Sequence, residues 1–343
     1  MNLQIWHRDP GPRIEGSRPL DALKVLTPSV VRTPEGGYRM FYTGVGPAKP
    51  FPACQGYILS AVSDDGLDFR PEPGIRLAPQ PDIAHRSRRV IAPSVTSCPG
   101  GWRMYVETRG PADLPSVICS AFSPDMLTWQ FEEGVRIETR SDVGAPRYLS
   151  LGTDRGRIYC FESDFGPEGK TGGPLQGMSV ISAATADGMH FEIEPGFRLP
   201  DARNEQESAG ITAAEVIAPG DGRTEWTMIY SAWQNPPAGT VVPVHPAEDT
   251  SSGDLSSADF AAASIAVDMC GFRARIYLAT SPDGLDWQRR GCVLEGDGYD
   301  ADGLDAVHAE DMSLLGLGDG RHRMYYAACD GKGTWRLVSA VSG

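Results

Sequence analysis

Apolar and polar residues alternate over many short stretches of this chain, and turn-forming residues repeatedly interrupt the alternation. The stretch Ser60-Ala61-Val62-Ser63 is followed by Asp65-Gly66 and then by an aromatic residue, Phe69. Asp-Gly between two alternating stretches is a strong hairpin signal, because glycine adopts the positive φ of a tight turn without a steric clash. Residues 60–69 therefore predict two antiparallel strands joined by a tight turn.

The same hairpin pattern recurs at residues 120–129, 182–191 and 278–287. Two further apolar segments precede each hairpin, as residues 27–31 and 39–42 do in the first unit. Residues 6–14 match the segment that follows each hairpin, and residues 337–343 match the segment before the turn. This split copy indicates that the N-terminal strand completes the last unit. We therefore predict an all-β fold, a five-bladed β-propeller with four-stranded antiparallel blades, in a single domain over residues 1–343.

The fourth unit is longer than the others because of an insertion at about residues 234–271. Its first part, residues 235–239, has loop composition, and residues 255–263 are compatible with one or two helical turns. Insertions in repeat proteins usually lie on one face, often the binding face. The insertion is thus a candidate lid or pocket wall, with a contact to another subunit as the alternative.

Composition narrows the classes of partner. The net charge of -14 argues against a nucleic-acid or anionic-membrane surface, which needs basic patches. The seven cysteines form no CxxC pair and no zinc-type cluster, so we expect reduced thiols, no metal and no cofactor. There is no apolar run of the length that spans a membrane, and residues 1–9 do not resemble a signal peptide. These features predict a cytoplasmic protein with a small-molecule or saccharide partner, and they leave the oligomeric state open.

Candidate chemistry follows from the predicted inner strands, whose side chains alternate with period two and point into a central funnel. Aligning the five units gives two inward columns. The first column is Thr27, Ala92, Ala145, Ala213 and His308. The second column is Ser29, Ser94, Arg147, Glu215 and Glu310. On the same alternation, Tyr148 and Asp311 should point away from the funnel.

The two carboxylates of the second column, Glu215 and Glu310, are the predicted catalytic pair. Two nearby carboxyl groups in a confined site can divide acid and base roles, because like charges raise one pKa. Arg147 would orient the substrate, or it would neutralise one of the two glutamates in a polar plug. The predicted substrate-binding residues are Ser29, Ser94, Arg147, His308, Glu107, Glu162, Trp233 and Arg88.

The hairpin motif, the Pro-Ser-Val inner strand at residues 28–30 and the Arg-Met-Phe-Tyr strand at residues 39–42 resemble the five-bladed propeller glycosidases. That group includes the arabinanase/xylosidase, invertase/levanase and mannoside-phosphorylase families. The resemblance implies the propeller fold and activity on sugars. Positions that carry catalytic carboxylates in the arabinanase-like enzymes are Thr27, Ala92 and Arg147 here, so no catalytic residue is carried over from the family.

We therefore expect an enzyme that acts on a sugar or sugar-like small molecule in the central funnel by acid/base carboxylate chemistry, as glycoside hydrolases do. The same residues would serve a lyase, isomerase or cyclase whose small anionic metabolite is held by Arg147. Phosphorolysis and a non-catalytic carbohydrate-binding propeller are the remaining alternatives.

Overall fold

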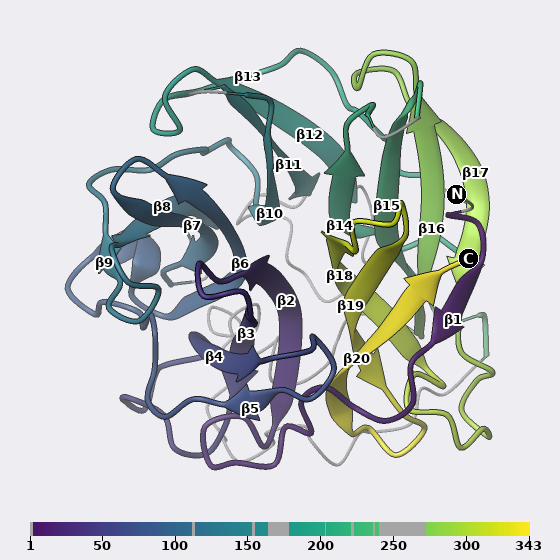
Figure 1. Cartoon of the computed structure of the whole chain (residues 1–343), viewed down its shortest axis with the longest axis horizontal. Helices are drawn as coiled ribbons and strands as arrows, with labels where there is room; N and C mark the ends of the chain where they lie inside the picture. The colour runs from purple at the N-terminus through teal and green to yellow at the C-terminus, as the bar shows by residue number, and fades with distance from the viewer. Residues whose placement is uncertain are drawn as a thin grey trace.

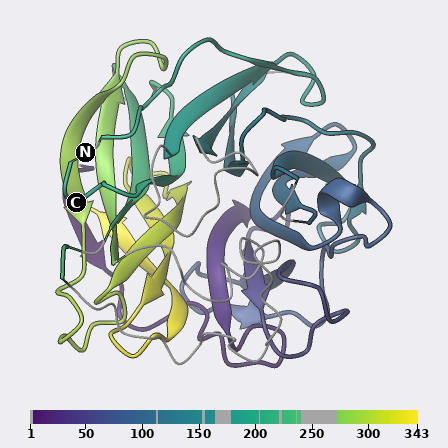
Figure 2. The ribbon, with the colours of Figure 1, turned by 180° about the vertical axis from the view of Figure 1, so that it is seen from behind.

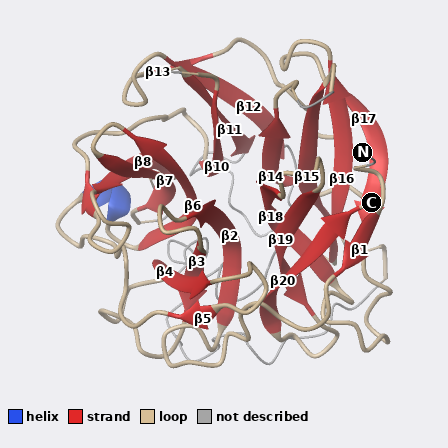
Figure 3. Ribbon diagram, viewed as in Figure 1, coloured by secondary structure: helices blue, strands red, loops and turns tan. Residues whose placement is uncertain are grey.

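The computed structural model describes residues 3–111, 114–152, 155–163, 178–202, 204–220, 223–235, 237–239 and 272–343. Most of the predicted insertion, residues 240–271, lies outside this part of the chain. Regular structure in the described residues is almost entirely β-strand, with one short 3-10 helix, Ala84–Arg86 (Figure 3). The predicted all-β class is confirmed.

Consecutive strands pair into four-stranded antiparallel sheets. The first sheet is β2 (Lys24–Arg32), β3 (Tyr38–Val45), β4 (Tyr57–Ser63) and β5 (Arg70–Pro71). The second is β6 (Arg89–Cys98), β7 (Gly101–Arg109), β8 (Val117–Ser123) and β9 (Gln130–Phe131). The third is β10 (Val143–Ser150), β11 (Gly156–Ser163), β12 (Met178–Thr185) and β13 (Phe191–Ile193).

The remaining strands form two antiparallel groups of four that share a single parallel bridge, between Ala274 and His308. One group is β14 (Gly210–Ile217), β15 (Trp226–Gln234), β16 (Arg273–Ser281) and β17 (Gln288–Leu294). The other is β18 (His308–Gly316), β19 (His322–Cys329), β20 (Trp335–Ser342) and β1 (Trp6–Arg8). Because β1 pairs antiparallel with β20, the two ends of the chain lie side by side (Figure 1).

The five groups follow one another around a centre, with β2, β6, β10, β14 and β18 innermost (Figures 1 and 2). We call these five the inner strands. Each inner strand contacts the next, and β18 contacts β2, so the contacts close into a ring. Apolar clusters fill the space between neighbouring groups, for example Val25 and Tyr42 against Tyr325 and Leu337.

The repeated hairpin connects neighbouring groups. Gly66, in the first hairpin, has a φ of 74°, and its carbonyl accepts a hydrogen bond from the Tyr325 hydroxyl of β19. The same bond occurs between Tyr105 and Gly188 and between Tyr159 and Gly284. The repeated tyrosine of one group therefore bonds to the repeated hairpin glycine of an adjacent group.

Each inner strand has an irregularity in its pairing with the next strand, as in a β-bulge. In four of them, a residue other than glycine at this point has a left-handed backbone. These residues are Thr27, Ala92, Ala145 and Asp311, with φ of 49°, 52°, 47° and 55°. In β14 the pairing shifts between Ile211 and Ala213. We call these sites the bulge positions.

The bulge positions correct the predicted alignment of the inner strands. Asp311, not His308, is the counterpart of Thr27, and Ser313 is the counterpart of Ser29. Glu215 lies two residues beyond Ala213, the first residue paired after the bulge in β14. The two predicted columns are therefore out of register with the first three units in the fourth and fifth units.

Candidate active site

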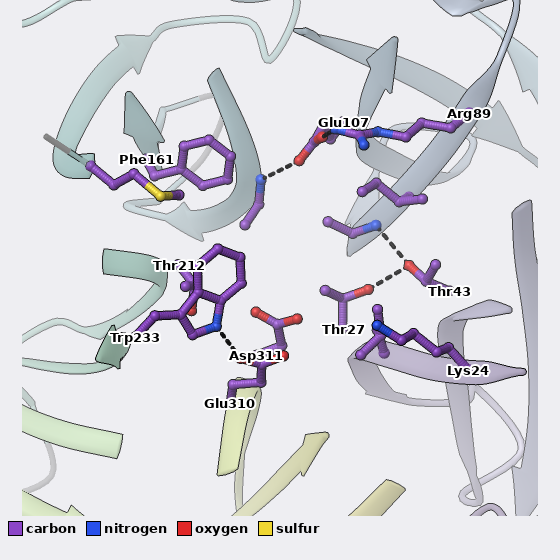
Figure 4. A pocket seen from close by; sticks show the side chains of 15 residues that line it. Lys24, Thr27, Thr43, Arg89, Glu107, Phe161, Thr212, Trp233, Glu310 and Asp311 are labelled. Atoms are coloured by element: carbon purple, nitrogen blue, oxygen red, sulfur yellow. Dashed lines mark hydrogen bonds and ion pairs between the residues drawn. The ribbon is translucent and has the colours of Figure 1, made fainter. Parts of the chain in front are cut away.

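A cavity of about 130 Å³ lies among the inner strands, at the end where these strands begin. All five inner strands line it, together with residues near the ends of the strands that follow them (Figure 4). Its polar and charged lining residues are Lys24, Thr27, Thr43, Arg89, Glu107, Thr212, Trp233, Glu310 and Asp311. Apolar walls come from Leu26, Ile91, Phe161 and Met178.

Two consecutive residues, Glu310 and Asp311, both line this cavity. Neighbouring side chains of a regular strand point to opposite faces, but the left-handed backbone of Asp311 breaks that alternation. The Asp311 N–H donates to Ser231 Oγ at 3.2 Å, which holds the bulge in place. The prediction that Asp311 points away from the funnel is therefore wrong.

Glu310 is oriented by an aromatic donor. The indole N–H of Trp233, near the end of β15, donates to Glu310 Oε2 (Figure 4). Both residues were predicted site residues, and both line the cavity. Trp233 therefore forms part of the cavity wall and also fixes the orientation of the Glu310 carboxylate through this hydrogen bond.

Glu107 of β7, another predicted site residue, also lines the cavity (Figure 4). Its Oε1 accepts a hydrogen bond from Arg89 at 2.6 Å, and its Oε2 accepts one from the N–H of Ala145 at 3.2 Å. The residue is only 3% exposed. A buried carboxylate with a close guanidinium and a backbone donor is a fixed negative charge with little freedom to turn.

The electrostatics of the cavity centre on Asp311. Its pKa is raised to about 7, chiefly by burial; the positive charges of Arg147 and Lys24 oppose the rise, and the negative charge of Glu107 adds to it. An acid with a pKa near neutrality can both hold and release a proton under physiological conditions. Asp311 is thus the carboxyl group in this cavity best suited to proton transfer.

Four members of the second predicted column, all but Glu310, are not among the residues that line this cavity. Ser29 Oγ accepts the N–H of Val95 at 3.1 Å, and Ser94 Oγ accepts the N–H of Tyr148 at 2.9 Å. Both serines therefore bond the next inner strand, and neither is among the residues that line the cavity. Their hydroxyls join neighbouring inner strands, and their part in substrate binding stays a prediction.

Arg147 and Glu215 also lie outside the cavity lining and form an ion pair, with Arg147 Nε 3.3 Å from Glu215 Oε2. This is the neutralising pair considered as the alternative to catalysis. Burial raises the pKa of Glu215 to about 7, opposed by Arg147 and by the backbone N–H of Leu314. Of the predicted catalytic pair, Glu310 lines the cavity and Glu215 does not.

Three other predicted residues are not brought to the cavity. His308 is buried, and its ring stacks on Trp335 with centroids 5.4 Å apart. Arg88 lines a separate, outer cavity with Phe51 and Leu114. Glu162 of β11 is not among the lining residues.

Among the residues that line the cavity, Lys24 and Arg89 were not predicted as site residues from the sequence. Both are buried, and each begins an inner strand three residues before the bulge position. The Lys24 ammonium lies 4.9 Å above the Trp335 ring. Their fixed spacing from the bulge position could have identified them, but this spacing can be read from the sequence only once the bulge position is known.

Two general searches of the described residues give negative findings. No group of three or more His, Cys, Asp or Glu side chains in this part of the chain is arranged to hold a metal ion. Within the same residues, no helix has the length and apolar character needed to cross a membrane.

Solved structures of carbohydrate-active proteins share this fold. An α-L-arabinofuranosidase from Lactobacillus brevis is 12% identical with a TM-score of 0.59, covering 95% of this chain and 94% of that one. A GH32 β-fructofuranosidase from Bombyx mori is 12% identical with a TM-score of 0.61, covering 97% and 62%. An N-acetylgalactosamine deacetylase from F. plautii, in complex with blood group B trisaccharide, is 14% identical with a TM-score of 0.62, covering 98% and 95%.

The sequence itself matches no family model and no curated protein. The likeness to the solved structures is therefore a likeness of fold, at identities too low to carry residues across. The resemblance to the propeller glycosidases, inferred above from the repeated motifs, is confirmed at that level.

Proposed function

We propose that this protein is a glycoside hydrolase-like enzyme that acts on a sugar by acid/base carboxylate chemistry in the cavity among the inner strands. The observation that carries the proposal is the pair Glu310 and Asp311, adjacent on one bulged strand, with the fixed carboxylate of Glu107 lining the same cavity. Glycoside hydrolysis requires carboxyl groups of this kind around the scissile bond.

The proposal includes the architecture that forms the site. The five groups of strands are taken as the blades of one five-bladed propeller, and β1 as the strand that closes the last blade. Two observations support this: the ring of contacts among the inner strands, and the antiparallel pairing of Trp6–Arg8 with residues 340–342. In this architecture the cavity lies at one end of the central funnel.

Each carboxyl group has a role in the proposed reaction. Asp311, which burial keeps protonated near neutrality, donates its proton to the glycosidic oxygen as the C–O bond breaks. Glu310, held by Trp233, accepts a proton from the water whose oxygen bonds to the anomeric carbon. Glu107, ion-paired with Arg89, adds a fixed negative charge that favours the positive charge developing on the sugar ring.

The cavity also indicates the size of the substrate. Its volume of about 130 Å³ suits a single small ring, and apolar walls such as Phe161 offer a surface for the C–H face of a sugar. Several polar groups of the wall are engaged with one another, as Thr27 is with Thr43. We therefore expect one terminal sugar unit to enter the cavity while the leaving group stays outside.

The test is turnover of a panel of nitrophenyl glycosides of pentoses and hexoses in both anomeric forms. For the best substrate, Glu310→Gln and Asp311→Asn should each lower kcat by a factor on the order of 10² or more, since each removes a proton-transfer group. The matched control is Asp319→Asn, an acid-to-amide change on an exposed turn, which should stay within about twofold of the native enzyme. Full activity in the folded Asp311→Asn variant, or no turnover of any glycoside, would contradict the proposal.

A further inference from the structure

Arg147 connects more inner strands than its role in one ion pair requires. From β10 it donates through Nε to the Met312 carbonyl of β18 at 3.1 Å, and through Nη1 to the Pro93 carbonyl of β6 at 2.8 Å. The same Nε lies 3.3 Å from Glu215 of β14. A single guanidinium, 3% exposed, thus joins four of the five inner strands.

The bond to Met312 places Arg147 next to the reacting carboxyl group, because Met312 directly follows Asp311. A residue other than glycine keeps a left-handed backbone only where surrounding contacts hold it there. The N–H of Asp311 is held by Ser231, and the carbonyl of the following residue is held by Arg147. These two bonds fix the bulge from both sides and so fix where the Asp311 carboxyl points.

Arg147 also contributes charge to two carboxyl groups. It favours the ionised forms of both Asp311 and Glu215, against the burial that favours their protonated forms. Its remaining nitrogen, Nη2, is buried and has no hydrogen-bond partner among the described residues. The ion pair with Glu215 therefore does not use all of the hydrogen-bonding capacity of the guanidinium.

Besides Arg147, two charged groups act on Asp311, and a third carboxyl group adjoins it on the same strand. Glu107 of β7 disfavours its ionised form, and Lys24 of β2 favours it. Glu310 precedes it on β18 and lines the same cavity. Arg147 also acts on Asp311, and it forms an ion pair with Glu215 that is not part of the cavity lining.

We propose that Arg147 is a positioning residue for Asp311, which aims the carboxyl into the cavity through Met312 and shares its positive charge between Asp311 and Glu215. The inference rests on the proposed function in taking Asp311 as the proton donor. Glu215 is then a regulator of that donor: when Glu215 is ionised it neutralises Arg147, and Asp311 keeps its proton to higher pH.

The test is a titration that needs no substrate. The full chain is labelled with carboxyl-¹³C aspartate, and the Asp311 resonance is assigned by its absence in Asp311→Asn. Glu215→Gln should lower the Asp311 midpoint by about one pH unit, because Arg147 then acts on Asp311 alone. Arg147→Gln should raise the midpoint by a similar amount. The opposite signs separate shared charge from general loosening of the strands.

The matched control is Ser313→Ala, on the same strand as Asp311. It removes the hydrogen bond that Ser313 accepts from the N–H of Val30 in β2, without changing any charge. Its Asp311 midpoint should stay at the native value. Unshifted midpoints in folded Glu215→Gln and Arg147→Gln would overturn the inference. If Arg147→Gln does not fold, Glu215→Gln alone decides the charge coupling.

The positioning role has its own measurement. Arg147→Lys keeps the charge but lacks the planar fork that reaches both carbonyls. Glycoside turnover should therefore fall about tenfold or more while the Asp311 midpoint stays near the native value. Native turnover in Arg147→Lys would overturn positioning. Shifted midpoints in a protein that cleaves no glycoside would instead count against the proposed function and leave the charge coupling standing.

Discussion

At the scale of single residues, the chemistry of the cavity depends on a backbone conformation that side chains seldom adopt. Left-handed φ at a residue with a Cβ costs roughly 1–2 kcal/mol, yet Thr27, Ala92, Ala145 and Asp311 all have it. In three of these the N–H is bonded to a side chain of the preceding group, as Ala92 is to Thr43. The bulge is therefore stabilised by the contact between neighbouring groups. In β18 it places the Asp311 carboxyl group at the cavity.

The raised pKa of Asp311 predicts a pH-dependent cost in stability. The native state keeps the Asp311 proton up to about pH 7, whereas the unfolded chain loses it near pH 4. As the pH rises from 4 to 7, the buried carboxyl group progressively reduces the free energy of unfolding. The reduction is complete above the native pKa. Asp311→Asn should thus raise the melting temperature at pH 8 by a few degrees more than it does at pH 4.

Thermal unfolding of both proteins at the two pH values measures this difference. Asp319→Asn serves as the reference, because it removes an exposed carboxyl group. An equal change in melting temperature at pH 4 and pH 8 would mean that Asp311 titrates in the native state as it does in the unfolded chain.

At the scale of strands, the sequence carries strong signals for the hairpins and weak ones for the inner strands. The Asp65 carboxylate accepts hydrogen bonds from the N–H groups of Leu67 and Asp68, so the residues of the turn themselves stabilise it. The bulge of β18 has no such marker, because no glycine stands at the left-handed residue. An alternation with period two that ignores the bulge therefore predicts that Asp311 points away from the cavity and that Glu215 points into it.

Two glycines of the first unit, one inside its hairpin and one after it, offer a prediction about how neighbouring groups are joined. Gly66 and Gly74 both have positive φ, but a Cβ at Gly66 would lie 2.9 Å from the Tyr325 hydroxyl, whereas one at Gly74 meets nothing within 4 Å. Both alanine variants bear the cost of the left-handed backbone, roughly 1 kcal/mol. Gly66→Ala should lose a further ~1–3 kcal/mol, because the contact with Tyr325 must shift.

Urea unfolding of the two variants side by side measures the difference in the free energy of unfolding. Gly74→Ala controls for the backbone cost, so the gap between the two variants reports the Tyr325 contact. Equal destabilisation would show that this contact contributes nothing to the joining of β19 with the first hairpin.

At the scale of the whole molecule, the cavity exists only because all five inner strands meet. Its charged groups come from three inner strands and from one strand that follows an inner strand: Lys24 from β2, Arg89 from β6, Glu310 with Asp311 from β18, and Glu107 from β7. The repeats foretold this convergence, because a ring of similar units points similar strands at one centre. They could not predict which side chains meet there, because left-handed bulge residues such as Asp311 interrupt the alternation of side chains along the inner strands.

The pairing of β1 with β20 predicts that the N-terminal strand stabilises the entire ring. Asp9 accepts bonds from Arg323 and Ser339, the arrangement that Glu72 has with Arg39 and Ser60 in the first sheet. Removing residues 1–9 would leave the polar edge of β20 unpaired and break this cluster. The truncated chain should melt at least several degrees below the full chain and self-associate.

A peptide with the sequence of residues 3–15 should restore the melting temperature of the truncated chain in proportion to its concentration, because it binds only the folded state. A peptide of the same composition in scrambled order is the control. Asp9→Asn in the full chain should give a smaller loss than the truncation, since it removes only one partly buried ion pair. A truncated chain that melts like the full chain would show that β1 only covers the edge of β20, and that the ring of inner strands closes without it.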